Sequence, residues 1–383
     1  MVFLHKIDLR LYLLYIVMSS IVIDNVSELE NRLEFDLKNV DLSVVNGLRR
    51  IILTKIPSLV IRGFPHPENL INIETNTTKY NNEYLKHRLS CIPILISSQS
   101  SFKKIIKDFV LKVHFKNETT DKMTLTTDHI KMYNKEGKLV KYKESKQTKS
   151  IFLEPPIPIC YLYPRITATE PLEEFKATIQ LSVGTAKEDA CWNMVSKCLF
   201  FNIEDNDKNE KILESIPEEK HTDFKLLDAQ RQYLPNEYTF VLETVGVYKN
   251  KEIVKMASLH IIETLNEYTE HLTKITIKTY VPNIPVEGPI HIYKKKMVEN
   301  DTMYIIKLEE DDYTYGKLIE KYIYNYYNTL FKFIAFKKEH PHDKHSLIQL
   351  VYLESDSDHK LIQLLLDIFK KIQVDFEHIK LDS

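Results

Sequence analysis

The sequence predicts an α+β fold in which two halves of similar layout are separated by a β-rich insertion. Three observations lead to this prediction. Residues 32–38 alternate apolar and polar side chains, as a half-buried strand does, and an amphipathic helix follows from Ser43. A second strand and helix follow one another from Met303. Between the two, from about residue 96 to residue 235, short strand-like runs are separated by polar stretches.

The N-terminal half is predicted to open with that first strand and helix. The helix ends before Pro57, and a strand then covers Leu59 to Ile61. A short helix is expected within residues 84–95. After the insertion, a strand at 238–247 and a helix at 253–272 close the half. The apolar stripe of the first helix consists of Val44, Val45, Leu48, Ile51 and Ile52.

The insertion combines strand-like runs, such as Phe109–Phe115, with charged stretches. The lysine-rich stretch Lys138–Lys149 is predicted to be a solvated surface. Residues Asn202–His221 are charged and nearly free of apolar side chains, so they are predicted to form a mobile surface loop.

The C-terminal half follows a linker-like segment at 281–288. A strand is expected at Met303–Leu308 and a helix at Tyr315–Leu330, with an acidic turn between them. Two further strands are expected at Phe331–Phe336 and Leu347–Leu353. The last helix has the clearest apolar stripe of the chain: Leu361, Leu364, Leu365, Ile368, Phe369 and Ile372.

The two halves repeat one pattern when Ser43 is aligned with Thr314. Each has a strand, an acidic turn, a hydroxyl residue suited to cap a helix, and a helix with an early glycine. The repeat predicts two related units that pair through their helices around a pseudo-two-fold axis. The residues expected to make this intramolecular dimerisation are Val44, Val45, Leu48, Ile52, Tyr315, Leu318, Ile319, Leu361, Leu365 and Ile368.

Composition argues against several classes of protein. The chain has 383 residues and a formal net charge of −2, so no overall field favours nucleic acid or a membrane. Only 7 glycines are present, and neither of the phosphate-binding motifs G-x-x-x-x-G-K-[ST] and G-x-G-x-x-G occurs. The 4 cysteines form no C-x-x-C pair, so the pattern does not favour a structural metal site.

The N-terminus carries a short apolar run, Leu11 to Met18, behind basic residues. It is too short to span a bilayer, and Asp8 interrupts the basic region that a signal peptide requires. We therefore expect residues 1–24 to be a dispensable extension, with Met18 as an alternative start, rather than a secretion signal.

Two stretches give the chain a family resemblance. Residues 39–61 (NVDLSVVNGLRRIILTKIPSLVI) resemble the opening helix of the third subunit of eukaryotic RNA polymerase II and of its archaeal (D-type) and bacterial (alpha-type) counterparts. Residues 73–94 (IETNTTKYNNEYLKHRLSCIPI) resemble the second hallmark stretch of that family. Residues 184–192 (GTAKEDACW) are similar to a loop of its inserted domain, and 241–247 to the close of its dimerisation domain.

The C-terminal half resembles a different polymerase component. Residues 308–319 (LEEDDYTYGKLI) and 336–345 (FKKEHPHDKH) resemble the eleventh subunit and its archaeal (L-type) counterpart. A chain that joins both resembles the fused form of some large DNA viruses, and enrichment in Lys, Ile, Asn and Tyr is typical of an AT-rich genome. Lys317, Glu320 and Lys321 stand where the family has Asn and Arg after its helix glycine, so arginine docking is expected in the N-terminal half only.

The resemblance implies a fold and a domain layout. The fold is the alpha-subunit-like dimerisation fold with an inserted β-rich domain and a second, smaller dimerisation unit in the same chain. The third-subunit-like domain is expected at 25–95 and 236–280, the insertion at 96–235 and the eleventh-subunit-like domain at 281–383.

The implied function is that of a non-catalytic platform on which a DNA-directed RNA polymerase assembles. Partners are expected to be the beta-like and beta-prime-like large subunits and small zinc-binding subunits, in a hetero-oligomer with little nucleic-acid contact and no membrane. Catalytic magnesium and structural zinc are expected in those partners and no cofactor in this chain. The place of action is expected to be the host cytoplasm (a viral factory) or the virion, with the nucleus as an alternative. The residues expected at the large-subunit interface are Arg49, Arg50, Glu74, Asn76, Thr77, Thr78, His87, Arg88, Lys187, Glu188 and Trp192.

Some residues allow more than one interpretation. Trp192 is either core of the inserted domain or an anchor for a partner. The H-x-H-D-x-H tract at His340–His345 contains metal-ligand types but is expected to be a loop without metal. The acidic run Glu309–Asp312 is expected to be a turn that complements a helix N-terminus, not a catalytic metal site. A free-standing binding module that regulates a host polymerase is the alternative function, and an enzyme is disfavoured because no nucleophile or cofactor constellation is present.

Overall fold

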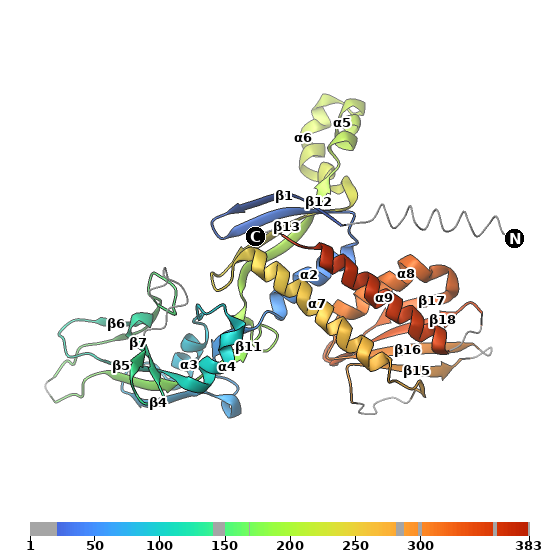
Figure 1. Ribbon diagram of the computed structural model, residues 1–383. Coiled ribbons are helices and arrows are strands. Elements are labelled where there is room, and N and C mark those ends of the chain that lie inside the picture. Colours follow the sequence, from blue (N-terminus) through green and yellow to red (C-terminus); the bar gives the residue numbers. More distant parts are fainter. Residues whose placement is uncertain are drawn as a thin grey trace. The chain divides into compact units, whose positions relative to one another are not determined.

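The computed structural model describes residues 21–140, 150–167, 169–280, 287–297, 301–354 and 358–381 (Figure 1). The apolar run before Met18 and most of the lysine-rich stretch at 138–149 lie outside these residues. The chain divides into two compact units. Unit 1 contains the residues up to Ile52, Lys197–Leu242 and those from Lys251 onward, whereas unit 2 contains Leu53–Ser196 and Glu243–Asn250. Helices and sheets both contribute, so the chain is α+β, as predicted.

Unit 1 contains one arrangement of strands and helices twice. The first copy consists of β1 (Val22–Leu29), β2 (Arg32–Lys38), α2 (Leu42–Thr54), β12 (Val195–Glu204), β13 (Tyr233–Thr244) and α7 (Asn250–Leu272). Its sheet has the strand order β1-β2-β13-β12, and β1 and β2 form an antiparallel hairpin. The alternation of β2 buries Leu33, Phe35 and Leu37, and Phe35 stacks on Phe240 of β13.

The second copy repeats that order. It consists of β15 (Ile290–Lys296), β16 (Thr302–Glu309), α8 (Thr314–Tyr327), β17 (Phe331–Lys337), β18 (His345–Tyr352) and α9 (Asp358–His378). Its sheet runs β15-β16-β18-β17, with the short strand β14 (Lys278–Thr279) added in parallel beside β15. Both copies therefore read strand–strand–helix–strand–strand–helix and place their four strands in the same order.

The first helices of the two copies also bury corresponding positions. Aligning Ser43 with Thr314 makes every buried residue of α2 coincide with a buried residue of α8. In α2 these are Val44, Val45, Gly47, Leu48, Ile51 and Ile52, and in α8 they are Tyr315, Gly316, Leu318, Ile319, Tyr322 and Ile323. All ten residues expected at the intramolecular dimerisation face are buried.

Unit 2 is built mainly from strands around its own core. Its largest sheet has the order β4-β10-β5-β7-β8, and two-stranded sheets β11-β3 and β6-β9 accompany it. The core cluster gathers side chains from these strands and from the helices, including Leu85, Phe102 and Phe175. The elements are β3 (Ser58–Ile61), β4 (Ile71–Asn76), α3 (Asn82–Ser90), α4 (Gln99–Asp108), β5 (Phe109–Lys116), β6 (Met123–Thr126), β7 (Ile130–Asn134), β8 (Leu139–Val140), β9 (Pro158–Leu162), β10 (Glu174–Ile179) and β11 (Leu181–Gly184).

One stretch of unit 1 has a secondary structure that differs from the prediction. Residues Asn202–His221, predicted to be a surface loop, contain the end of β12 and helix α5 (Asn206–Ser215). The Asp205 side chain accepts a hydrogen bond from the Lys208 backbone N–H and so caps this helix. Buried Asn209 donates to the Ala229 carbonyl and ties the helix to the returning chain. Local hydrogen bonds thus order a segment with few apolar residues.

Within the described part of the chain, no helix is both long and apolar enough to cross a membrane.

Candidate subunit interface

Helices α2 and α8 are joined at both of their ends. Near the end of α2, Arg50 donates from Nε to Thr314 Oγ1 (2.9 Å) and from Nη2 to Asp312 Oδ2 (2.7 Å), at the start of α8. At the start of α2, Asp41 Oδ2 accepts from Asn325 Nδ2 (3.4 Å), in the last turn of α8. The end of each helix therefore meets the beginning of the other, so the two helices run antiparallel.

Asp312 connects the two copies through opposite charges. Its second oxygen lies 3.3 Å from Lys338 Nζ, and the Lys338 side chain is only 3% exposed. Lys338 also donates to the Asp343 carbonyl (2.8 Å), which satisfies its buried ammonium group further. Because Asp312 itself is half exposed, the pair with Arg50 contributes modestly to stability and mainly fixes the register of the two helices.

Carboxylates cap the two equivalent helices, in place of the predicted hydroxyl residues. Asp311, which is buried, accepts from the backbone N–H groups of Tyr315 and Gly316 (both 3.0 Å) and from Ser346 Oγ (2.7 Å). Asp41 accepts from the Ser43 N–H (2.8 Å) in the first copy. The predicted cap was wrong because Thr314 instead accepts from Arg50 and Ser43 Oγ has no partner in the described chain. The expected charge complementarity at the helix start is found at Asp311.

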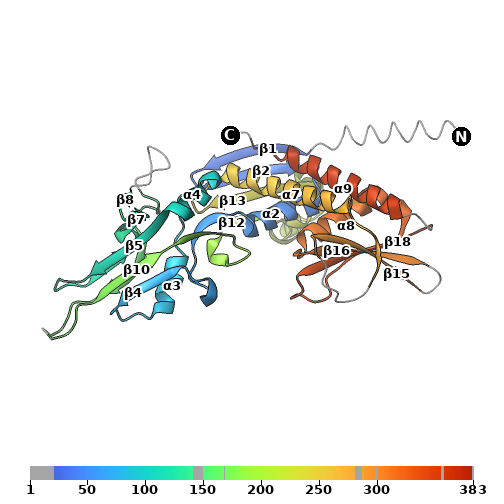
Figure 2. The same ribbon diagram turned by 60° about the horizontal axis from the view of Figure 1, so that its bottom comes forward.

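Helix α7 of the first copy packs against α8 and α9 of the second, and Figures 1 and 2 both show α7 and α9 side by side. Tyr315 donates to Thr264 Oγ1 (3.0 Å), and its ring lies 5.8 Å from that of Tyr268. Tyr268 also meets Phe369 of α9, at 6.0 Å between ring centroids. Burial raises the pKa of Tyr315, so the phenol stays a neutral donor at this contact.

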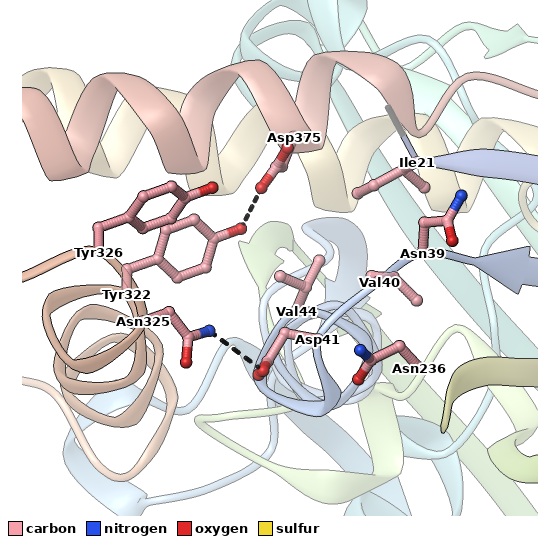
Figure 3. A pocket seen from close by; sticks show the side chains of 10 residues that line it. All are labelled: Ile21, Asn39, Val40, Asp41, Val44, Asn236, Tyr322, Asn325, Tyr326 and Asp375. Carbon is pink, nitrogen blue, oxygen red and sulfur yellow. Dashed lines mark hydrogen bonds between the residues drawn. The ribbon is translucent and has the colours of Figure 1, made fainter. Parts of the chain in front are cut away.

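A polar pocket of about 240 Å³ lies where the start of α2 approaches α8 and α9 (Figure 3). Tyr322 of α8 donates to the carboxylate of Asp375 on α9, and Asp41 faces Asn325 across the pocket. Burial raises the pKa of Asp375, although the hydrogen bond from Tyr322 opposes that effect. The polar lining belongs to the junction of the two copies, where side chains from both meet.

The two arginines expected to dock a large subunit have different surroundings. Arg49 turns back on its own helix and donates from Nη2 to Asn46 Oδ1 (2.8 Å). Arg50 is engaged by Thr314 and Asp312, as described above. Arg50 therefore has a role inside the chain that the sequence did not reveal, whereas the role of Arg49 at a partner surface stays a prediction.

The predicted interface residues of the 73–94 stretch lie in unit 2, and three of the six stabilise the loop between β4 and α3. Asn76 Oδ1 accepts from both the backbone and the hydroxyl of Thr78 (3.1 and 2.7 Å). Thr77 Oγ1 donates to the Leu172 carbonyl (3.1 Å). Glu74 lies on β4 and pairs with Lys176 Nζ (2.7 Å). Asn76, Thr77 and Thr78 thus shape the connection from β4 to α3.

The last turn of α3 carries two more predicted interface residues. His87 is exposed, and its Nε2 lies 4.0 Å from Cys91 Sγ. Arg88 donates to the Pro158 carbonyl and so joins α3 to β9. Of these two residues, His87 is the one that is exposed to solvent.

The loop at 184–192 is organised by Arg62, which the sequence pattern did not single out. The Arg62 guanidinium lies 4.6 Å from the centroid of the Trp192 ring. It also forms ion pairs with Glu188 (2.7 Å) and Glu68 (3.1 Å) and donates to the Val183 carbonyl (3.2 Å). A side chain that is 11% exposed thus satisfies its charge with two carboxylates that are themselves about half exposed.

Trp192 lies in the core of unit 2, with 3% of its surface exposed. It has little surface to offer a partner, which favours the core interpretation over that of an anchor. Its ring lies against Gly184, where a Cβ atom would come within 2.6 Å of Trp192 Cε3. Close packing of this kind explains the glycine at the start of the loop.

The outer part of the same loop exposes Lys187 and Glu188. The Lys187 backbone N–H donates to the Thr54 carbonyl (2.9 Å), which fixes the loop to the end of α2. Burial is the largest single influence on Glu188 and raises its pKa. Hydrogen bonds from Arg62 and Thr185 outweigh burial and hold the pKa of Glu188 below its ordinary value.

Replacement of Arg62 by alanine is expected to destabilise unit 2 by about 2 kcal/mol, because it removes the cation–π contact and leaves two carboxylates unpaired. The half-exposed carboxylates recover hydration, which keeps the loss from being larger. Urea unfolding followed by fluorescence of Trp192, the single tryptophan, measures this loss directly. The exposed Lys103 on α4 provides the control, since Lys103→Ala should change the free energy by less than about 0.5 kcal/mol. Equal stability of the two variants would contradict the role assigned to Arg62.

The histidine tract forms a turn stabilised by its own aspartate. Asp343 Oδ2 accepts from the His340 N–H (2.9 Å), and His340 Nδ1 accepts from the His342 N–H (3.2 Å). Across the residues that the structure describes, no three side chains of His, Cys, Asp or Glu are arranged to hold a metal ion.

Comparison with known proteins places these features in a family. A family model described as the RNA polymerase Rpb3/Rpb11 dimerisation domain matches residues 34–265. The chain is 39% identical over 74 residues to DNA-directed RNA polymerase II subunit RPB3 of Schizosaccharomyces pombe, covering 19% of this chain and 22% of that protein. It is 35% identical over 65 residues to human DNA-directed RNA polymerases I and III subunit RPAC1, covering 17% of each.

A plant relative gives a similar result. The subunit 3 shared by DNA-directed RNA polymerases II, IV and V of Arabidopsis thaliana is 34% identical over 61 residues, which cover 16% of this chain and 17% of that protein. The aligned segments thus span about a fifth of the curated relatives. The family model is far more extensive and covers more than half of the chain, from β2 to the middle of α7. The chain therefore belongs to the RNA polymerase Rpb3/Rpb11 dimerisation domain family.

Proposed function

We propose that the chain is a non-catalytic assembly subunit of a multisubunit DNA-directed RNA polymerase, with both halves of the alpha-type platform in one polypeptide. The observation that carries the proposal is the antiparallel contact of α2 with α8, between two copies of the same strand and helix order. In a family defined by a dimerisation domain, such a contact is what an intramolecular pseudo-dimer requires.

The covalent link has a thermodynamic consequence for such a platform. Two separate subunits pair according to their concentrations, whereas linked halves meet at an effective concentration on the order of millimolar. Fusion also fixes their ratio. Under the proposal, unit 1 is the pseudo-dimer, in which residues from about 281 onward act as the eleventh-subunit-like half, and unit 2 contains the inserted β-rich domain.

The proposed partners are the beta-like and beta-prime-like large subunits, together with small zinc-binding subunits, in a hetero-oligomer. The catalytic magnesium and structural zinc are assigned to those partners, and this chain supplies no catalytic group or cofactor. Direct contact with nucleic acid is proposed to be minor. The fused layout and the AT-rich type of composition support a large DNA virus as the source, with action in the host cytoplasm or the virion, or alternatively the nucleus.

Substitutions of Arg49 and Arg50 distinguish docking of a partner subunit from pairing between the two copies within the chain. Arg49→Ala is expected to leave the fold intact and to lower recovery of the beta-like subunit, because among the described residues the Arg49 side chain hydrogen-bonds to Asn46 of its own helix. Arg50→Ala is expected to lower the free energy of unfolding by up to about 1 kcal/mol, since it removes a partly exposed ion pair between the copies. Recovery is measured by tagged purification with the co-expressed large subunits, and stability by urea unfolding.

Arg32→Ala is the matched control, because Arg32 is an exposed arginine whose ion pair, among the described residues, is with Glu34 of its own strand. Its recovery and stability should equal those of the unaltered chain. Recovery of the tagged chain without any large subunit would overturn the proposed function. Undiminished recovery with Arg49→Ala would instead remove only the docking role of that arginine.

A further inference from the structure

The exposed face of the largest sheet of unit 2 carries an unusual arrangement of charge. Alternation along β5 buries Leu111 and Val113 and turns Lys112 outward. The neighbouring strand β7 turns Lys131 outward on the same face. Lys112 and Lys131 are direct cross-strand partners, so two ammonium-bearing side chains stand opposite each other. Like charges in this position destabilise a sheet.

Neither lysine of this pair forms an ion pair among the residues that the structure describes, although the charge of Lys112 helps to lower the pKa of Glu74. Lys112 Nζ lies 5.5 Å from the centroid of the Tyr133 ring, a contact that a cation makes without losing its charge. The two lysines therefore form a local excess of positive charge on a chain whose formal net charge is −2.

Two carboxylates on the same face are already engaged. Glu74 pairs with Lys176 (2.7 Å) and accepts from Thr178 Oγ1 (2.7 Å), and Glu174 pairs with His114 (2.8 Å). These contacts lower the pKa of Glu74, mainly through its hydrogen bond with Lys176, and hold it ionised. The face thus combines these engaged carboxylates with the lysine pair and with Asp128, which lines the same pocket.

A pocket of about 290 Å³ opens at this place. Its lining includes Lys112, Lys131, Lys176 and Tyr133, together with the carboxylates Glu74 and Asp128. A volume of this size accepts one or two side chains of an extended segment, and the pleated surface beneath it supplies an aromatic ring for their apolar parts.

We propose that this face binds an acidic segment of a partner polypeptide, whose carboxylates are received between Lys112 and Lys131. The binding of such a segment relieves the repulsion of the lysine pair, so the charges that weaken the free sheet strengthen the complex. A nucleic acid fits less well. Its phosphates are evenly spaced, and some would face Glu74, Asp128 or Glu174, whereas an acidic peptide can place single carboxylates. This inference goes beyond the assembly function and does not depend on the pairing of α2 with α8.

The test uses the full chain and a fluorescein-labelled decaglutamate peptide, with binding followed by fluorescence anisotropy at low salt. Lys112→Glu with Lys131→Glu should weaken binding at least about tenfold. Lys103→Glu with Lys104→Glu, which changes the net charge equally on the exposed side of α4, should weaken it less than about twofold. Emission from Trp192 verifies that both variants keep unit 2 folded.

Two further measurements test the kind of ligand and the repulsion between the lysines. A single-stranded oligothymidylate of matched charge should bind more weakly than the peptide, and tighter binding would overturn the proposal in favour of nucleic acid. Lys131→Thr should raise the urea midpoint of unit 2 in the absence of peptide, because it removes the like-charge contact. Equal peptide affinity of the two charge-reversed variants, or no binding by the unaltered chain, would also overturn it.

Discussion

Replacing Asp311 with alanine is expected to lower the free energy of unfolding of unit 1 by about 3 kcal/mol. The Asp311 carboxylate is buried and accepts from two backbone N–H groups at the start of α8 and from Ser346 Oγ. Hydrogen bonds to a charged group contribute about 1.5–3 kcal/mol each but are not additive, and their loss leaves buried donors unsatisfied. The loss also removes a negative charge from a helix N-terminus.

Urea unfolding followed by far-ultraviolet circular dichroism measures this effect, because the long helices α7 and α9 both belong to unit 1. Glu310→Ala is the matched control, since it removes the adjacent acidic side chain, which is 64% exposed. It should change the free energy by less than about 0.5 kcal/mol. If the two variants unfold at the same urea concentration, Asp311 does not cap α8 in solution.

Phe369→Ala is expected to have an effect of about 3–5 kcal/mol, because it leaves a cavity in a packed core. Phe369 lies on α9, is fully buried, and meets Tyr268 of α7 at 6.0 Å between ring centroids. The cavity thus opens at the place where the two copies pack together. We also expect proteolysis to cut the variant faster than the unaltered chain, since local opening at this junction becomes more frequent.

Val374→Ala on the same helix provides the control for Phe369. Val374 is 41% exposed, so its truncation should cost less than about 1 kcal/mol. Differential scanning calorimetry of the two variants separates a general effect of altering α9 from the effect of a buried cavity. A loss of less than about 1 kcal/mol for Phe369→Ala would show that the contact between α7 and α9 is not retained in solution.

The elements that could be predicted from the sequence are those whose pattern is local. Helix α2 was predicted because its apolar residues recur at helical spacing and Pro57 follows. Strand β2 was predicted because its alternation is uninterrupted. Helix α5 was missed because its stability depends on the Asp205 cap and on Asn209, not on an apolar stripe. Helix α4 was also missed, inside a region predicted to be mainly strands.

The candidate site was predictable only in part, because its decisive contacts join residues that are far apart in sequence. Arg50 meets Asp312 and Thr314 because helices α2 and α8 pack antiparallel. No local sequence pattern reveals that packing. Arg62 offered one weak signal, a charged residue directly after the buried strand β3. Its partners Glu188 and Trp192 lie more than a hundred residues away, so the signal could not name them.

The interrupted course of unit 1 has a consequence for the order in which a ribosome releases the chain. Residues Leu53–Ser196 of unit 2 emerge between the first and the second part of unit 1. Strand β2 is synthesised long before β13, its neighbour in the sheet. At a translation rate of ~5–20 residues per second, β13 follows on the order of ten seconds or more later. During that interval the apolar stripe of α2 does not yet have its antiparallel neighbour α8 to pack against. The nascent chain therefore exposes the apolar face of α2 early in synthesis. Transiently exposed apolar surface of this kind is prone to aggregate and is what chaperones bind.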